Sequence, residues 1–457
     1  MRKKFVFTCL LLSGCLLLPG CSRLFIVRAD KLLAAPAASA LQLEIIKGFE
    51  RQHKQPYTLQ APIYGEYVSS FLMRDIDSDE EDEAVFFYQT NHGNKNICCC
   101  VMDHHQGEWE LSADIEGPAG RVYDVAFADM NADGFEEIVI GWYFGDFSRN
   151  KLLTINGKTS PDKQYSVLAA EPFCEKLIED IDGNGSDDLF VVVSDFSSVS
   201  SRAYAKLLVM KNGAVKLASQ ARIDSKASGY SRLKGEKATD SSPLRIYIDT
   251  VKGENQMITD VVYWDIGTAS LVSMLMDNET LTNKIAPRPA NIASFDINND
   301  GVIEIPCQET QPLEGGAVYI SQGEQAAPFF MTGWLAVEQK NGTKTVMRTA
   351  CNTDEGYYMN FPPLQNGKAA VASYIYDRRW DIISTQTNGV KPETLFSVKV
   401  FEPPQWQKEN NASGKYRELF TTALGVAGVS ITPAGFSQGL TYSNIGAYFG
   451  LTGKGEQ

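Results

Sequence analysis

Four short acidic segments recur along the chain, and each leads directly into an apolar run. They read DIDSDEEDEAVFF from Asp75, DMNADGFEEIVIG from Asp129, DIDGNGSDDLFVV from Asp180 and DINNDGVIEIP from Asp296. A degenerate fifth copy near Asp249 keeps only the outline of strand, loop and strand. Successive copies begin 47 to 69 residues apart. This period suits a four-stranded structural unit and is too long for leucine-rich or ankyrin repeats.

The segments between these copies are typical of short strands. Runs rich in aromatic, Val and Ile residues alternate with Gly, Asn and Asp turns from residue 57 to about residue 400. We therefore predict an all-β fold, a β-propeller of about seven four-stranded blades over residues 57–457. Six or eight blades also fit the length, at about 55 residues for each blade. Short helices are expected at both ends, over Leu41 to Phe49 and near SQGLTYSNIGAYFGL, where Thr441 or Ser443 is the candidate N-cap.

The acidic segments share the pattern D-x-[DN]-x-[DN]-G-x-x-[DE], which is typical of a cation-binding loop. Oxygen atoms at positions 1, 3 and 5 of a tight loop converge on one point, and an acid at position 9 closes the set. Position 6 bends sharply, which glycine does with least strain. The candidate ligands are Asp129, Asn131, Asp133 and Glu137 in the second loop, Asp180, Asp182, Asn184 and Asp188 in the third, and Asp296, Asn298, Asp300 and Glu304 in the fourth.

The first loop departs from the pattern at its bend. Its candidate ligands are Asp75, Asp77, Asp79 and Glu83, but Glu80 stands where the other loops have glycine. Seven acids among nine residues also repel one another. We therefore expect about three Ca²⁺ ions, or four if the first loop also binds. The other interpretation is that all four loops are solvated turns.

These loops are not EF-hands, because position 12 is not glutamate and strands flank them in place of helices. The chain resembles the FG-GAP or VCBS repeat of calcium-binding β-propellers. The four loops and the strands after them carry this resemblance, over roughly residues 60–345. It implies a closed propeller that holds calcium in the loop between the first two strands of some blades.

The N-terminus has the features of an export signal. Residues 1–4 are basic, residues 5–20 lack charge, and Leu18-Pro19-Gly20-Cys21 resembles the lipobox of bacterial lipoproteins. We expect a signal peptide over 1–20, lipidation at Cys21, and a tether with a short helix over 21–56. Cys15 is an alternative lipidation site. The resemblance implies a lipid anchor on the extracytoplasmic face of a bacterial cell membrane, and similarity to clostridial lipoproteins favours a Gram-positive one.

The composition limits the partners and the chemistry. A net charge of -14 repels the phosphates of nucleic acids. The chain lacks the common nucleophile, zinc-protease and phosphate-loop motifs. We therefore predict a binding or scaffold module for protein or carbohydrate and no enzyme. The alternative is a propeller hydrolase or lyase that acts on polysaccharide. Five aromatic residues are candidates for a sugar-binding surface, although core packing is preferred: Trp142, Tyr143, Trp264, Trp334 and Trp380.

The run ICCCVMDHH places three cysteines near two histidines, which raises the alternative of a metal site. Adjacent strand residues point to opposite faces, so Cys99 faces away from Cys98 and Cys100. No C-x-x-C spacing is present. We therefore predict that these thiols are buried in the middle strand of a blade.

Overall fold

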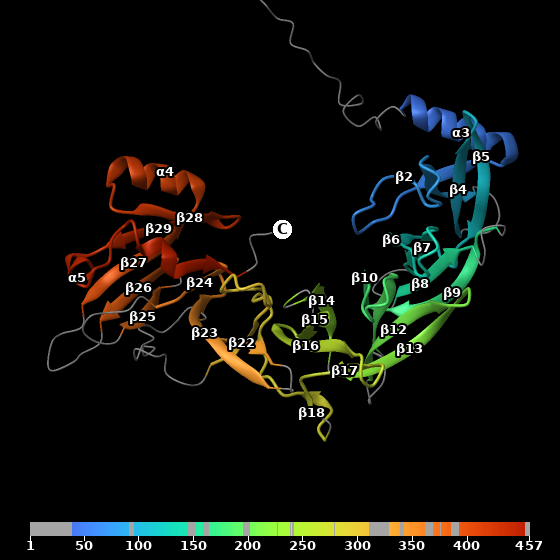
Figure 1. Cartoon of the computed structure of the whole chain (residues 1–457). Coiled ribbons are helices and arrows are strands. Elements are labelled where there is room, and N and C mark those ends of the chain that lie inside the picture. The colour runs from blue at the N-terminus through green and yellow to red at the C-terminus, as the bar shows by residue number, and fades with distance from the viewer. Residues whose placement is uncertain are drawn as a thin grey trace, which may run out of the picture.

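The computed structural model describes residues 39–452 apart from 91–95, 145–150, 159–163, 195–201, 226, 238, 240–241, 278, 310–328, 339–341, 362–368, 375 and 385–392. The predicted signal peptide (1–20) and Cys21 lie outside these residues. Within them the chain is mostly β, with six antiparallel sheets of four or five strands and one two-stranded ribbon. Figure 1 shows the sheets following one another along an arc from the blue N-terminal end to the red C-terminal end.

The first three sheets are formed by consecutive strands. Sheet 1 contains β1 (Tyr57–Gln60), β2 (Phe71–Arg74), β3 (Glu83–Thr90), β4 (Ile97–His105) and β5 (Glu108–Glu116). Sheet 2 contains β6 (Val122–Ala128), β7 (Glu137–Trp142), β8 (Lys151–Gly157) and β9 (Ser166–Phe173). Sheet 3 contains β10 (Glu175–Glu179), β11 (Asp188–Ser194), β12 (Ala203–Lys211) and β13 (Ala214–Ile223).

The other sheets include strands from more distant segments. Sheet 4 contains β14 (Gly229–Glu236), β15 (Arg245–Lys252), β16 (Gln256–Asp265), β17 (Ser270–Ser273) and β20 (Arg288–Pro289). The ribbon pairs β18 (Met276–Asp277) with β19 (Thr282–Asn283). Sheet 5 contains β21 (Ile305–Gln308), β22 (Phe329–Val337), β23 (Thr343–Asn352), β24 (Tyr357–Met359) and β30 (Phe449–Leu451). Sheet 6 contains β25 (Ala369–Tyr374), β26 (Arg379–Ser384), β27 (Thr394–Phe401), β28 (Arg417–Thr422) and β29 (Gly425–Ile431).

The hydrophobic core lies between successive sheets, because both faces of the inner sheets are apolar. In β11, Leu189 and Val191 pack toward sheet 2, whereas Phe190 and Val192 pack toward sheet 4. This alternation follows from the two-residue period of a strand. Further clusters lie between sheets 1 and 2, 4 and 5, and 5 and 6. The face-to-face stacking of small sheets is the packing expected for propeller blades.

The cysteine run follows the same alternation. Strand β4 lies between β3 and β5, as predicted for a middle strand. Cys99 packs in the cluster between sheets 1 and 2, whereas Cys100 packs in the cluster on the other face of sheet 1. All six cysteines of the described residues are free thiols. Trp142, Trp334 and Trp380 are buried, so these three rings belong to the core.

Two helices cover the outer faces of the end sheets. Helix α3 (Ala40–Gln52) begins at the N-cap Ser39, whose hydroxyl accepts a hydrogen bond from the Gln42 N–H at 3.1 Å. Its Phe49 is fully buried against Phe86 and Tyr88 of β3. At the other end of the arc, helix α4 (Pro403–Ala412) lies against β27 and β29 of sheet 6.

The predicted C-terminal helix is wrong in type and start. The segment forms a single 3₁₀ turn, η1 (Ile445–Tyr448), whose N-cap is Asn444 and neither Thr441 nor Ser443. The chain then becomes β30, which pairs with β24. The ladder with β24 satisfies the backbone groups that a longer helix would otherwise have paired within itself. A short helix, α5 (Pro433–Ser437), precedes this turn.

Six sheets of blade size are present in the described residues, and no hydrogen-bonded ladder there joins sheet 6 to sheet 1. None of the described helices is both long enough and apolar enough to span a membrane.

Replacing Phe49 by alanine tests the docking of α3. We expect Phe49→Ala to lower the free energy of unfolding by about 3–5 kcal/mol, because a fully buried ring is lost. Leu41→Ala, at an exposed position of the same helix, should change it by less than about 0.5 kcal/mol. Urea unfolding measures both. Equal losses would show that Phe49 does not anchor the helix.

Candidate metal centre

The four acidic loops lie at equivalent places in four sheets. Loop 1 (75–83) joins β2 to β3, loop 2 (129–137) joins β6 to β7, and loop 3 (180–188) joins β10 to β11. Loop 4 (296–304) is closed by an antiparallel bridge between Phe295 and Glu304 and leads into β21. Each loop therefore connects neighbouring antiparallel segments, which is the position that the sequence pattern predicts.

All four loops have the same backbone conformation at two positions. Position 6 has a positive φ in each, at Glu80 (73°), Gly134 (86°), Gly185 (89°) and Gly301 (82°). Position 4 is also left-handed, at Ser78 (60°), Ala132 (57°), Gly183 (77°) and Asn299 (58°). The glycine at the bend thus has the role expected of it. Glu80 adopts the same conformation despite its Cβ, at a cost of about 1–2 kcal/mol.

The position-1 aspartates organise the turn through their carboxylates. Asp129 accepts hydrogen bonds from the N–H groups of Asp133 at 3.1 Å and Gly134 at 3.0 Å. The same two bonds, to positions 5 and 6, occur in the other loops, with Asp75, Asp180 and Asp296 as acceptors. These bonds hold the loop closed around the carboxylate of position 1.

The closing acids at position 9 are almost completely buried: Glu83, Glu137, Asp188 and Glu304 are each 0–2% exposed. One oxygen of each accepts a hydrogen bond from the N–H of position 2, at 2.8–3.1 Å. Burial is the main cause that raises the pKa to about 7 for the three glutamates and to about 6 for the aspartate. Neighbouring loop carboxylates raise these pKa values further.

The second oxygen of the closing acid lacks a protein partner in three loops. Glu83 Oε1, Asp188 Oδ1 and Glu304 Oε1 are buried without a hydrogen bond among the described residues, and so is Asp77 Oδ1. A buried anionic oxygen without a partner is energetically costly. A bound cation would supply the missing partner, so the residues present fit a metal ion.

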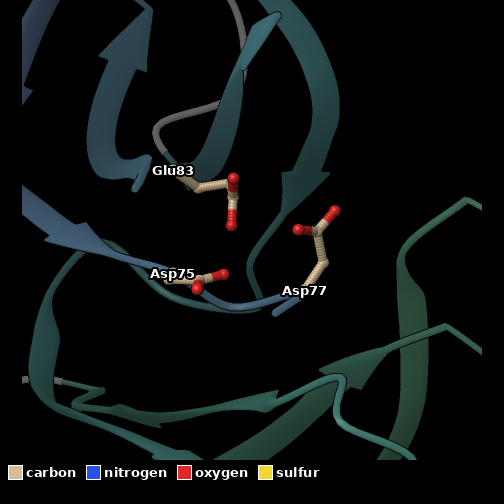
Figure 2. A group of neighbouring side chains, drawn as sticks. All are labelled: Asp75, Asp77 and Glu83. Carbon is tan, nitrogen blue, oxygen red and sulfur yellow. The ribbon is translucent and has the colours of Figure 1, made fainter. Parts of the chain in front are cut away.

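Two loops bring three acids close enough to share one ion. Oxygen atoms of Asp75, Asp77 and Glu83 lie within 4.8 Å of one another, as do those of Asp180, Asp182 and Asp188. Figure 2 shows the first group, with three carboxylates from the loop and the start of β3 directed toward a common space. Loops 2 and 4 have asparagine at position 3, so a neutral amide replaces one carboxylate there.

Neighbouring loops are bonded to one another through position 8. In loop 2 the Glu136 N–H donates to the Ile76 carbonyl of loop 1 at 2.8 Å. In loop 3 the Asp187 N–H donates to the Asp129 carbonyl of loop 2 at 3.0 Å, and the Asp187 carboxylate accepts the Asp129 N–H. The Arg74 guanidinium also forms an ion pair with Glu136. The pattern D-x-[DN] did not reveal these links, because they join residues about 60 positions apart.

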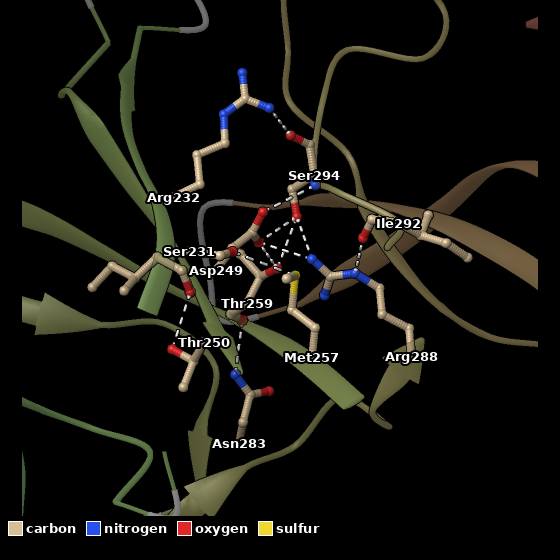
Figure 3. Close-up of polar contacts among 11 residues, drawn as sticks. Ser231, Arg232, Asp249, Thr250, Met257, Thr259, Asn283, Arg288, Ile292 and Ser294 are labelled. Atoms are coloured by element: carbon tan, nitrogen blue, oxygen red, sulfur yellow. Dashed lines mark hydrogen bonds and ion pairs between the residues drawn. The ribbon is translucent and has the colours of Figure 1, made fainter. Parts of the chain in front are cut away.

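The degenerate fifth copy has a different polar site. Asp249 lies inside strand β15 and not at the start of a loop. Its carboxylate pairs with Arg288 at 2.8 Å, and both side chains are buried. The Thr259 and Ser294 hydroxyls also donate to it, as Figure 3 shows. A guanidinium therefore supplies the positive charge at this carboxylate, a role that sequence periodicity could not assign to Arg288.

The histidines beside the cysteine run are not gathered with the thiols into a metal-binding group in the described part of the chain. His104 instead contacts Glu81 of loop 1 at 2.9 Å. Burial raises the pKa of the Cys98 thiol, which keeps it protonated and a poor metal ligand.

No protein-family model matches the chain, and no curated protein is significantly similar to it in sequence. One similar solved structure is a protein from Lactobacillus plantarum, with 8% identity over 73% of this chain and 85% of that chain, and a TM-score of 0.28. Another is Sqt1 from Saccharomyces cerevisiae, with 10% identity over 80% of this chain and 96% of that chain, and a TM-score of 0.30.

Replacing Glu80 by glycine tests the strain at the bend of loop 1. We expect Glu80→Gly to raise the free energy of unfolding by about 0.5–1 kcal/mol, because glycine adopts a positive φ without a Cβ clash. Asp82→Gly removes the same charge at a residue without a positive φ, and it should lower stability. Urea unfolding in the presence of a chelator compares them. Equal gains would show that charge relief, and not backbone strain, is the cause.

Proposed function

We propose that the chain is a calcium-stabilised β-propeller, held at the extracytoplasmic face of a bacterial membrane by a lipid and acting as a binding module. The observation that carries the calcium part is the buried, unpartnered oxygen of the closing acid in loops 1, 3 and 4. Such an oxygen needs a positive partner that none of the described residues supplies. The shared backbone of the four loops supports a site in each of them.

The ligand chemistry favours calcium over a transition metal. Every candidate ligand is a carboxylate or amide oxygen, and histidine and cysteine are missing from the four loop sequences. Calcium is a hard cation that takes six to eight oxygen ligands in flexible geometry, whereas magnesium demands a stricter octahedron. Zinc and copper prefer nitrogen and sulfur ligands.

The role that we assign to the ions is structural. A cation in a loop neutralises clustered carboxylates and fixes the turn, and loops 2 and 3 are each bonded through position 8 to the preceding loop. Binding at one loop would therefore also hold two neighbouring sheets together. The millimolar calcium of extracellular compartments is sufficient for sites of modest affinity.

We assign six blades to the propeller, one for each large sheet. The stacking of apolar faces between successive sheets supports this assignment. In a closed ring, the outer faces of the first and last sheets would pack against each other. Helices α3 and α4 cover these two faces instead. We therefore propose an open arc of six blades, in which a helix covers the outer face of each end sheet.

A titration with calcium tests the metal sites. Calcium at a hundredfold excess over the dissociation constant should raise the free energy of unfolding by about 2–3 kcal/mol for each site. In Asp188→Asn, one site is lost because the amide lacks the anionic charge. In chelator this variant should be at least as stable as the parent, because a buried carboxylate has been removed.

Isothermal titration counts the ions, and thermal unfolding with and without chelator reports stability. The control is Glu254→Gln, which changes an exposed acid in the turn of the degenerate copy. Glu254→Gln should bind as many calcium ions as the parent chain. A chain that binds no calcium, or an Asp188→Asn variant that keeps the full count, would contradict the metal assignment.

The lipid anchor rests on the resemblance of residues 18–21 to a lipobox. In a bacterial host, the chain should incorporate radiolabelled palmitate and partition with membranes. Cys21→Ser should abolish the labelling, whereas Cys15→Ser should retain it. If Cys15→Ser abolishes the labelling and Cys21→Ser retains it, the modified residue is Cys15. If neither the parent chain nor a variant is labelled, the lipid anchor is refuted.

A further inference from the structure

A cavity of about 590 Å³ lies on the inner side of the arc, between four successive sheets. Strands β2, β6, β10 and β14 each contribute lining residues, and the segment before β2 covers part of it. Asp187 of loop 3 also lines the cavity, so an acidic loop lies at its edge. Its volume falls in the range of about 300–1,000 Å³ that is usual for small-molecule sites.

The charged groups in the wall are largely paired with one another. Lys176 forms an ion pair with Asp124, and Arg74 forms one with Glu136. Arg232 donates to the Ser294 carbonyl at 3.2 Å. A guanidinium carries five N–H donors, so the part-exposed Arg74 and Arg232 keep donors beyond these contacts. The Lys176 and Asp124 side chains are only 9% and 12% exposed, and their charges offset each other. A wall of this kind favours a ligand rich in hydroxyl groups over a strongly charged one.

An exposed tyrosine stands at the edge of this cavity. Tyr64 lines it, is 59% exposed, and stacks one face on Tyr123 with ring centroids 5.2 Å apart. The Tyr64 N–H donates to the Tyr123 carbonyl at 2.8 Å, so the backbone holds the ring in place. Stacking on one face leaves the other available as a flat apolar surface beside the polar wall.

We propose that this cavity binds a neutral oligosaccharide, with the Tyr64 ring against the apolar face of a sugar and the guanidinium groups of Arg74 and Arg232 bonded to its hydroxyl groups. A sugar ring presents an apolar C–H face and a rim of hydroxyls, which matches an aromatic ring next to planar polar groups. This inference rests on the proposed role as a binding module and names the class of its ligand.

The probes are five neutral tetrasaccharides: cellotetraose, xylotetraose, mannotetraose, laminaritetraose and tetra-N-acetylchitotetraose. Each is titrated calorimetrically into the full chain, in detergent and millimolar calcium. We expect at least one to bind, and Tyr64→Ala to weaken that binding by about tenfold, because the flat surface is lost. Tyr64→Phe should retain affinity, since the ring remains. The matched control is Tyr376→Ala, at a tyrosine that is 85% exposed, lies in the turn between β25 and β26, and does not line the cavity.

If none of the five probes binds, the inference is overturned. This is the result expected if the ligand is a peptide. Binding that Tyr64→Ala leaves unchanged also overturns it. The shift in thermal unfolding with calcium is measured on the same samples. A calcium shift without saccharide binding refutes only the saccharide site, whereas Tyr64-dependent saccharide binding without a calcium shift refutes only the metal role.

Discussion

The buried carboxylate that ends each acidic loop is the constraint on which the arrangement of the sheets depends. It stands at the first residue of a core strand, or just before one, and one of its oxygens holds the loop backbone. Burial opposes its ionisation, which is why its pKa is raised. Loops 1, 2 and 3 are bonded to one another, so the charge state of their closing carboxylates affects the contacts between the first three sheets. The cation that we propose would offset the charge of this buried carboxylate.

Hydrophobic packing between the sheets also stabilises the fold. Inner strands such as β11 are apolar on both faces, and each face is buried against a different sheet. The end sheets have only one neighbouring sheet, so helices α3 and α4 cover the outer faces that remain. The concave side of the arc carries the paired charges and Tyr64. The candidate binding surface is thus formed by β2, β6, β10 and β14, some of whose residues also pack in the core between the sheets.

Much of the candidate metal centre could be predicted from the sequence, because its ligands lie within nine residues. Local spacing determines which oxygen atoms gather, and the glycine at position 6 marks the left-handed bend. The strands after the loops were also predictable from their continuous apolar runs. The C-terminal segment was not, because local capping signals were outweighed by pairing of β30 with β24. The strand, loop and strand of the degenerate copy were predicted, but the pairing of Asp249 with Arg288 was not, because the two residues are 39 positions apart in the chain.

By itself, the sequence determined the all-β character, the positions of the four loops and the identity of the oxygen-bearing side chains in them. These properties depend on two-residue alternation and on turns of nine residues, both of which are local. Only the tertiary structure decided which sheets stack, that helices cover the two end sheets, and that Tyr64, Asp124 and Lys176 border one cavity. Such contacts join residues from different sheets, and their formation depends on the shape of the whole arc and not on any short pattern.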